Sequence, residues 1–169
     1  MKTLSLEFLQ AEATVKNLIY RFARAIDRVD EPLMRELFWE NAGDDHGLFA
    51  GTAAEYVDWV MPLLKSMHAT QHTISNILVD LDGDKATAET YFVAYHQIGE
   101  GAEAIDMIAA GRYFDSFEKR DDEWRFSYRK AVYDWNRNDP VSENWSSDDF
   151  KNLLERGARK PDDYLYKNR

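Results

Sequence analysis

The chain contains no cysteine among its 169 residues. Disulfide bonds, catalysis by a thiolate and cysteine-based metal sites are therefore excluded. A chain without cysteine also suits a reducing compartment, so we expect a cytoplasmic location.

Long apolar runs are missing as well. No stretch approaches the roughly 20 apolar residues that a helix needs to cross a bilayer. The first segment, MKTLSLEFLQAEATVK, includes Glu7 and Glu12 and has no apolar run of signal-peptide length. We therefore expect a soluble protein without a membrane partner.

Positive charge is in deficit, with 21 Lys and Arg residues against 31 Asp and Glu residues and a formal net charge of −10 at pH 7. Nucleic acids and anionic membrane surfaces both require a positive protein face, so neither is expected as a partner. Hydrophobic residues make up 44% of the chain, and aromatic residues alone make up 14%. A chain of this length and composition can form one domain with an apolar core.

The first part of the chain has helical periodicity. Apolar residues recur every three or four positions from about residue 5 to 27, which predicts an amphipathic helix. Asp30 precedes a second predicted helix, with Pro32 in its first turn. The glycines and aspartates of residues 41–51, NAGDDHGLFAG, then predict a loop.

A third helix is predicted to begin at Thr52, because Thr52 and Glu55 form a capping box. It should continue to about Met67, with Pro62 kinking or dividing it. A short helix is also predicted near the C-terminus, over residues 147–156.

The middle of the chain has the period of two that is typical of strands. Residues 72–98 predict two strands joined by a tight turn at Asp82-Gly83-Asp84. Two further strands are predicted over residues 104–120 and 123–135. Helices followed by antiparallel strands indicate an α+β fold, in which the helices pack on one face of a curved sheet and leave a cavity between the layers.

Asp27 and His72 are the candidates for chemistry. Asp27 continues the apolar side of the first helix, and His72 stands at the start of the first long strand. If one ring nitrogen of His72 donates to Asp27, the other nitrogen is available as a base, and the carboxylate stabilises the imidazolium. No Gly-x-Ser-x-Gly elbow is present, so proton transfer is favoured over acyl transfer. The alternative is that Asp27 is a surface residue at a helix end and His72 is structural.

The three other histidines have different expected positions. His96 or Tyr95 should lie opposite His72 on the neighbouring strand, depending on the length of the turn. His46 is expected at the surface or as an anchor of its loop, and His68 is expected to be exposed at a helix end. No H-x-H or HExxH spacing occurs, so no metal site is predicted.

Two arginines stand in otherwise apolar strands. Arg112 and Arg129 could each form an ion pair or bind an anionic leaving group, because a guanidinium offers several fixed donors. Tyr91, Tyr133 and Trp135 could line a cavity or belong to the core.

Three segments together resemble the SnoaL-like branch of the nuclear-transport-factor-2-like superfamily: residues 18–38, 72–97 and 111–135. The resemblance extends over about residues 8–140 and leaves residues 141–169 as a C-terminal extension of a single SnoaL-like domain. It implies a cone-shaped α+β barrel with a deep apolar pocket, and a homodimer or homotrimer.

Within this superfamily the sequence is most similar to hexachlorocyclohexane dehydrochlorinases, scytalone dehydratases and bile acid 7α-dehydratases. These are cofactor-free lyases with a histidine and an aspartate in the cavity. The resemblance implies that Asp27 and His72 are catalytic, and that Arg129 takes the place of an arginine on the last strand. No cofactor is expected.

One position departs from these enzymes. Five residues before the aspartate, the dehydrochlorinases have a lysine and the bile acid enzymes a tyrosine, whereas this chain has Phe22, which donates no hydrogen bond. Assistance to a leaving group is therefore expected from Tyr20, His96 or Arg112, and Trp135 is a further candidate for substrate binding.

The expected function is elimination from a small or medium-sized apolar molecule, cyclic or aromatic in character, with a dehydratase as the leading form. An isomerase or polyketide cyclase that uses the same base is one alternative. A non-catalytic module that binds a small ligand is the other, and in that case Asp27 and His72 would form a buried structural pair.

Overall fold

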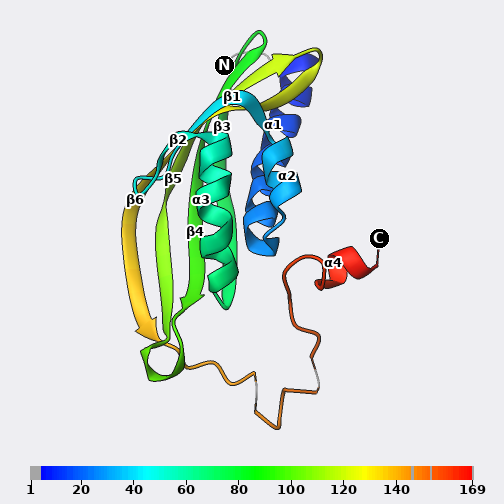
Figure 1. The fold of residues 1–169 in the computed structure, drawn as a ribbon. Helices are drawn as coiled ribbons and strands as arrows, with labels where there is room; N and C mark the ends of the chain where they lie inside the picture. The colour runs from blue at the N-terminus through cyan, green and yellow to red at the C-terminus, as the bar shows by residue number, and fades with distance from the viewer. Residues whose placement is uncertain (1–4, 146, 153, 169) are drawn as a thin grey trace.

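The computed structural model describes residues 5–145, 147–152 and 154–168 (Figure 1). Its elements follow in the order α1 (Leu6–Arg28), α2 (Glu31–Glu36), β1 (Phe38–Asp45), β2 (Ala50–Thr52), α3 (Ala53–Ser66), β3 (Ala69–Asp82), β4 (Lys85–Ile98), a 3₁₀ turn (Gly101–Glu103), β5 (Ile105–Arg120), β6 (Glu123–Pro140) and α4 (Tyr164–Lys167). No helix among these residues is both long and apolar enough to cross a membrane.

The strands form one curved sheet in the order β2-β1-β6-β5-β4-β3, and α1, α2 and α3 lie on one side of it (Figure 1). This confirms the predicted α+β class. Two details differ from the expectation. The sheet is mixed, because β1 pairs with β6 in parallel while the other neighbours are antiparallel. It is also open rather than closed into a barrel, with β2 and β3 as its edges.

The helix α1 begins and ends at residues that suit those positions. The side chain of Ser5 caps its first turn by accepting from the Phe8 amide at 3.1 Å. Its apolar stripe is buried, and its last turn carries Asp27 into a buried position beside β3. Asp30 then caps α2 by accepting from the Leu33 amide, so the chain turns sharply between the two helices.

The predicted loop at residues 41–51 was wrong, because most of it forms β1 and β2. Glycine and aspartate are poor strand formers, but tertiary pairing overrides that preference: Gly43 and Asp44 pair with β6 as well as with β2. Pro62 does not divide α3, which continues from Ala53 to Ser66 with the proline on its exposed side.

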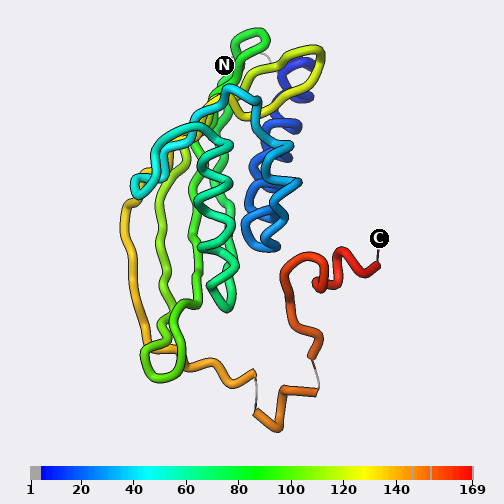
Figure 2. The backbone as a smooth tube through the Cα atoms, viewed as in Figure 1, coloured from blue at the N-terminus to red at the C-terminus, as the bar shows by residue number. Residues whose placement is uncertain are grey.

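The C-terminal prediction also needs correction. The described residues between 147 and 156 form turns and extended chain rather than a helix, and the helix of this region is α4. Figure 2 shows the chain after β6 passing the open end of the sheet and returning to the C-terminal end of α1. The extension therefore lies next to the region where Asp27 is placed.

An aromatic cluster fills the end of the layer near the two hairpin turns. Phe22 of α1 contacts Phe38 edge to face at 5.9 Å between ring centroids, and Phe117 and Phe126 lie 4.5 Å apart. All four side chains are buried. His72 lies near the start of β3, at the other end of that strand from its turn, so the polar pair lies away from this part of the core.

Candidate active site

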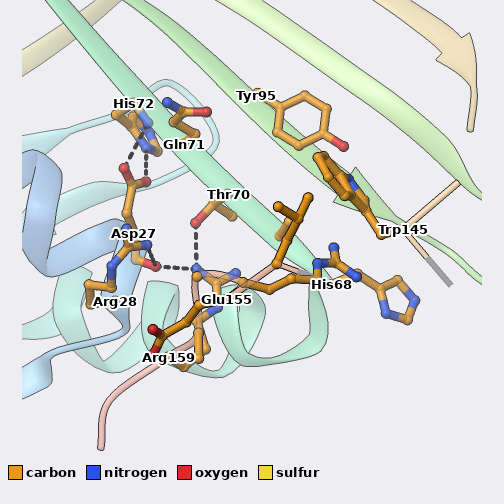
Figure 3. A pocket seen from close by; sticks show the side chains of 15 residues that line it. Asp27, Arg28, His68, Thr70, Gln71, His72, Tyr95, Trp145, Glu155 and Arg159 are labelled. Atoms are coloured by element: carbon orange, nitrogen blue, oxygen red, sulfur yellow. Dashed lines mark hydrogen bonds and ion pairs between the residues drawn. The ribbon is translucent and has the colours of Figure 1, made fainter. Parts of the chain in front are cut away.

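Asp27 and His72 are in direct contact across the seam between α1 and β3. His72 Nδ1 lies 2.8 Å from Asp27 Oδ1, and the His72 backbone N–H donates to Asp27 Oδ2 at 2.9 Å (Figure 3). The side chain of His72 is 6% exposed and that of Asp27 is 12% exposed. Both carboxylate oxygens are occupied by one residue, which fixes the ring relative to the helix.

This geometry defines the state of the imidazole. A carboxylate accepts hydrogen bonds, so Nδ1 carries the proton and Nε2 presents its lone pair. Among the described residues, none forms a hydrogen bond with Nε2. The pair can therefore take up a proton at Nε2 and stabilise the resulting imidazolium through Asp27.

Two pockets meet at this pair. The larger, of about 610 Å³, is lined by the start of β3 and by residues 154–159 as well as by Asp27 and His72. The smaller, of about 290 Å³, is lined by Tyr20 and neighbouring residues of α1, again with Asp27 and His72. Tyr20, one of the residues expected to assist a leaving group, therefore lies in the same pocket as the pair.

His96 lies beside His72, although not directly opposite it. The two rings meet edge to face with 5.4 Å between centroids. His72 pairs with Ala94, so the predicted partner, His96 or Tyr95, was wrong. The cause is a bulge at Asn76: from the turn, the register would have placed Tyr95 opposite His72, and the extra residue shifts the pairing by one.

Burial keeps His96 uncharged. Desolvation lowers the pKa of His96 to about 4 from an ordinary value of 6.5. The nearby His72 and Arg159 act in the same direction, and Asp27 opposes them. Its Nδ1 is buried and has no hydrogen-bond partner among the described residues. At neutral pH, His96 can donate a hydrogen bond from its single ring N–H but cannot act as an imidazolium acid.

The pKa of His96 should make the protein less stable as the pH falls. Between pH 6.5 and about 4 the unfolded chain binds a proton at this residue while the folded chain does not, so acidification favours unfolding. The contribution is on the order of 3 kcal/mol over this interval. Urea unfolding at several pH values should show a weaker acid destabilisation in His96→Gln than in the parent. Parallel pH profiles for the two proteins would contradict this explanation.

Arg129 and Phe22 belong to the core rather than to the two pockets. The Arg129 Nε and Nη2 atoms both donate to Asp115 at 2.7 Å, and neither side chain is exposed to solvent. The guanidinium carbon lies 3.9 Å from the ring centroid of Phe22. Burial opposes the charge, but Asp115 outweighs burial and raises the pKa of Arg129. The described contacts of Arg129 are those of a structural ion pair.

Arg112 and Trp135 lie on the outer face of the sheet, away from His72. Arg112 binds Glu89 and Asp134, at 3.1 and 3.2 Å. Trp135 pairs with Ala110 and is 53% exposed. A register shift between β5 and β6 causes this, since without it Trp135 would pair with Ala109 and share the face of His72. The structure therefore does not bring either residue to the site, contrary to the expectation.

His46 lies in the short loop between β1 and β2 and is buried, so of the two predicted alternatives the surface position was wrong and the loop anchor agrees with the structure. Its Nδ1 is bonded to Asp44, and its ring stacks on Tyr56 with 4.4 Å between centroids. Asp44 is the second-last residue of β1 and His46 directly follows the strand. The spacing of two is the signal that could have placed the two side chains on one side of the chain. His68 is exposed, as predicted.

The C-terminal extension supplies pocket residues that the sequence did not reveal. Arg159 Nη1 donates to the Asp27 carbonyl oxygen at 2.5 Å and to Thr70 Oγ1 at 2.6 Å (Figure 3). The Lys160 N–H donates to the Arg28 carbonyl at 2.8 Å. The sequence of this segment is polar and aperiodic, and no pattern in it indicates a docked conformation.

Within the described ranges, no group of three His, Cys, Asp or Glu side chains has the arrangement needed to hold a metal ion. Tyr20 and Arg159 line the pockets together with the pair of His72 and Asp27, and the uncharged His96 lies against His72 without lining either pocket.

Comparison with known proteins gives the family. A model of the SnoaL-like domain matches residues 7–130, which is most of the chain. The chain belongs to the SnoaL-like domain family. No curated protein matches the sequence with significance.

Solved structures share the fold of this SnoaL-like protein at low sequence identity. A hexachlorocyclohexane dehydrochlorinase of type 2 has a TM-score of 0.72 and 20% identity, covering 81% of this chain and 93% of that one. The type 3 dehydrochlorinase from Novosphingobium barchaimii has a TM-score of 0.69 and 20% identity, covering 81% and 94%. A Novosphingobium aromaticivorans protein with a provisional assignment as a scytalone dehydratase has a TM-score of 0.70 and 21% identity, covering 79% and 91%.

Proposed function

We propose that this SnoaL-like protein is a cofactor-independent lyase that eliminates water or another small group from an apolar, cyclic or aromatic molecule. The contact between His72 and Asp27 carries the proposal, since it holds one ring nitrogen on a carboxylate and leaves the other free at a pocket. The names of the dehydrochlorinases and of the dehydratase that share the fold support the same class of reaction.

In the proposed reaction, His72 Nε2 takes a proton from a carbon atom of the substrate. The electron pair of that C–H bond forms a carbon–carbon double bond, and the bond to the leaving group breaks with its electron pair on that group. Asp27 stabilises the imidazolium that results. A correctly placed base of this kind contributes about 10²–10⁴ in rate, and orientation within the pocket adds to it.

Assistance to the leaving group falls to Tyr20 or His96. Tyr20 lines the smaller pocket beside the pair, and the uncharged ring of His96 lies against that of His72. Either can donate a hydrogen bond to a departing oxygen or halide. Phe22 takes no part, because its ring is buried in the aromatic cluster.

The test is the mass of the product. The purified protein is incubated with a panel of β-hydroxy carbonyl compounds and halogenated cyclic compounds, and the products are weighed by mass spectrometry. A lyase removes the mass of water or of a hydrogen halide. Turnover without a change of mass, with deuterium incorporated from heavy water, would identify an isomerase or cyclase instead. Binding without turnover of any compound would identify a ligand-binding module.

We further propose that copies of this chain associate through the outer face of the sheet. Tyr91, Val93 and Phe114 are each 40% exposed there, next to Trp135. A cluster of large, solvent-exposed apolar side chains is typical of a protein–protein interface. Replacing Trp135 with Glu should shift a dimer or trimer toward monomer in sedimentation velocity, whereas Leu63→Glu, on the exposed side of α3 and away from this face, should not. A monomeric parent protein would refute the proposal.

A further inference from the structure

One wall of the larger pocket belongs to the C-terminal extension. Residues 154–159 line it on one side, and Asp27, Thr70 and His72 line it on the other (Figure 3). The extension is fixed in this place by polar contacts to the turn between α1 and α2. Lys160 Nζ and the Tyr166 hydroxyl both donate to Asp30, at 2.8 and 2.9 Å.

Arg159 is the residue of this wall that lies nearest to the catalytic pair. Its Nη1 is held by two neutral acceptors, the Asp27 carbonyl oxygen and Thr70 Oγ1. Thr70 stands two residues before His72 and pairs with His96 across the strands, so the guanidinium lies beside both imidazoles. Arg159 therefore contacts both sides of the seam that His72 and Asp27 span.

The charge of Arg159 is not balanced by a carboxylate of its own. Among the described residues it forms no ion pair, and its Nη2 is shielded from solvent without a hydrogen-bond partner. Burial lowers the pKa of Arg159, although Asp27 opposes this. Arg159 is half-buried, whereas Arg129, which is fully buried, is paired with Asp115 on two nitrogens. A desolvated guanidinium without a counter-ion is costly, and an anion placed beside it removes that cost.

The charged residues that line the larger pocket are mainly basic. Although the chain has a net charge of −10, Arg28, Arg156 and Arg159 line this pocket against two carboxylates, Asp27 and Glu155. Asp27 is already used by His72, and Arg28 pairs with Asp163 outside the lining. Two aromatic side chains also line it, Tyr95 and Trp145, and Arg156 lies over the ring of Trp145. Because Tyr95 follows Ala94, the partner of His72, it lies on the opposite face of the sheet from His72. The positive charge, rather than the aromatic surface, is therefore next to His72 and Asp27.

We propose that the substrate of this site carries a carboxylate, which Arg159 binds. The inference rests on the proposed function, because it takes this pocket to be the place where the substrate binds. If the carboxylate is attached to the carbon that loses its proton to His72, negative charge develops on the carboxylate oxygens as the C–H bond breaks. Arg159 then stabilises that charge without forming or breaking a covalent bond.

The experiment compares trans-cinnamate with cinnamamide, which have the same shape but differ in charge. Their affinities are measured by isothermal titration calorimetry for the parent, Arg159→Met, Arg159→Lys and, as a matched control, Arg137→Met, which removes an exposed arginine on β6. We expect the parent to bind cinnamate about 10- to 100-fold more tightly than cinnamamide. Arg159→Met should lose this preference, Arg159→Lys should keep part of it, and Arg137→Met should keep all of it. Circular dichroism verifies that each variant is folded.

Equal affinity of the parent for the two compounds, or no binding of either at millimolar concentration, would overturn the inference, as would a preference that survives in Arg159→Met. Chloride is titrated as well: if it displaces cinnamate with comparable affinity, the site holds a departing anion rather than a carboxylate of the substrate, and the inference fails. The same comparison in His72→Ala separates this inference from the proposed function. If His72→Ala still prefers cinnamate and the parent eliminates nothing from any compound, only the proposal of a lyase is rejected.

Discussion

Replacing His72 with Ala should lower turnover of any substrate found for this protein by about 10²–10⁴-fold, while the fold remains intact. The imidazole is the only group in the described pockets that combines a free ring nitrogen with a carboxylate partner. Folding should survive because the backbone N–H of residue 72 still donates to Asp27 Oδ2 in the variant. The measurement is kcat for elimination, with thermal unfolding followed in parallel.

His68→Ala is the matched control. His68 lines the larger pocket as well, but it is exposed and its ring contacts the Gly99 carbonyl rather than a carboxylate. We expect its kcat to remain close to that of the parent. Undiminished turnover in His72→Ala would remove the base from the mechanism and leave only the fold and the pocket.

The second large effect concerns stability rather than catalysis. Asp115→Ala should lower the free energy of unfolding by about 3–5 kcal/mol, because it leaves the guanidinium of Arg129 buried and unpaired. For a protein of this size the melting temperature should fall by roughly 10 °C or more. Urea unfolding measured by circular dichroism gives the free energy directly.

A double variant separates the ion pair from simple packing. Asp115→Leu combined with Arg129→Met removes both charges and fills a similar volume, so most of the lost stability should return. Glu123→Ala, which breaks an exposed pair with Arg125, should cost less than about 1 kcal/mol. If Asp115→Ala is no worse than Glu123→Ala, the buried pair contributes little to folding.

The sequence was sufficient to predict the elements with strong periodicity and clear caps. The capping box of Thr52 and Glu55, the turn at Gly83 and the helix that carries Asp27 are all present. From the residues alone, the contact between Asp27 and His72 was one of two alternatives, and the resemblance to SnoaL-like enzymes favoured it; the structure shows the contact. Their catalytic role remains a prediction.

What could not be predicted depends on contacts between distant segments. Residues 41–51 form strands only because β6 and β2 supply partners, and no local preference indicates this. The positions of Trp135 and Tyr95 each depend on a single extra residue in a strand. Such a residue changes the face of the sheet to which the following side chains point, and the sequence of the strand does not indicate it. Arg159 reaches the site through a polar segment whose docking is decided by Asp30 and Asp27, more than a hundred positions earlier.

The extra residue at Asn76 has a consequence for how relatives should be aligned. Asn76 lies between the β3–β4 turn and His72. The chain from the turn to His72 is therefore one residue longer than it would be if β3 and β4 paired without a bulge. A homologue without this insertion would need its histidine one place closer to the hairpin to reach the same carboxylate. Gaps should therefore be permitted within this strand, since a fixed count would align the wrong residue with His72.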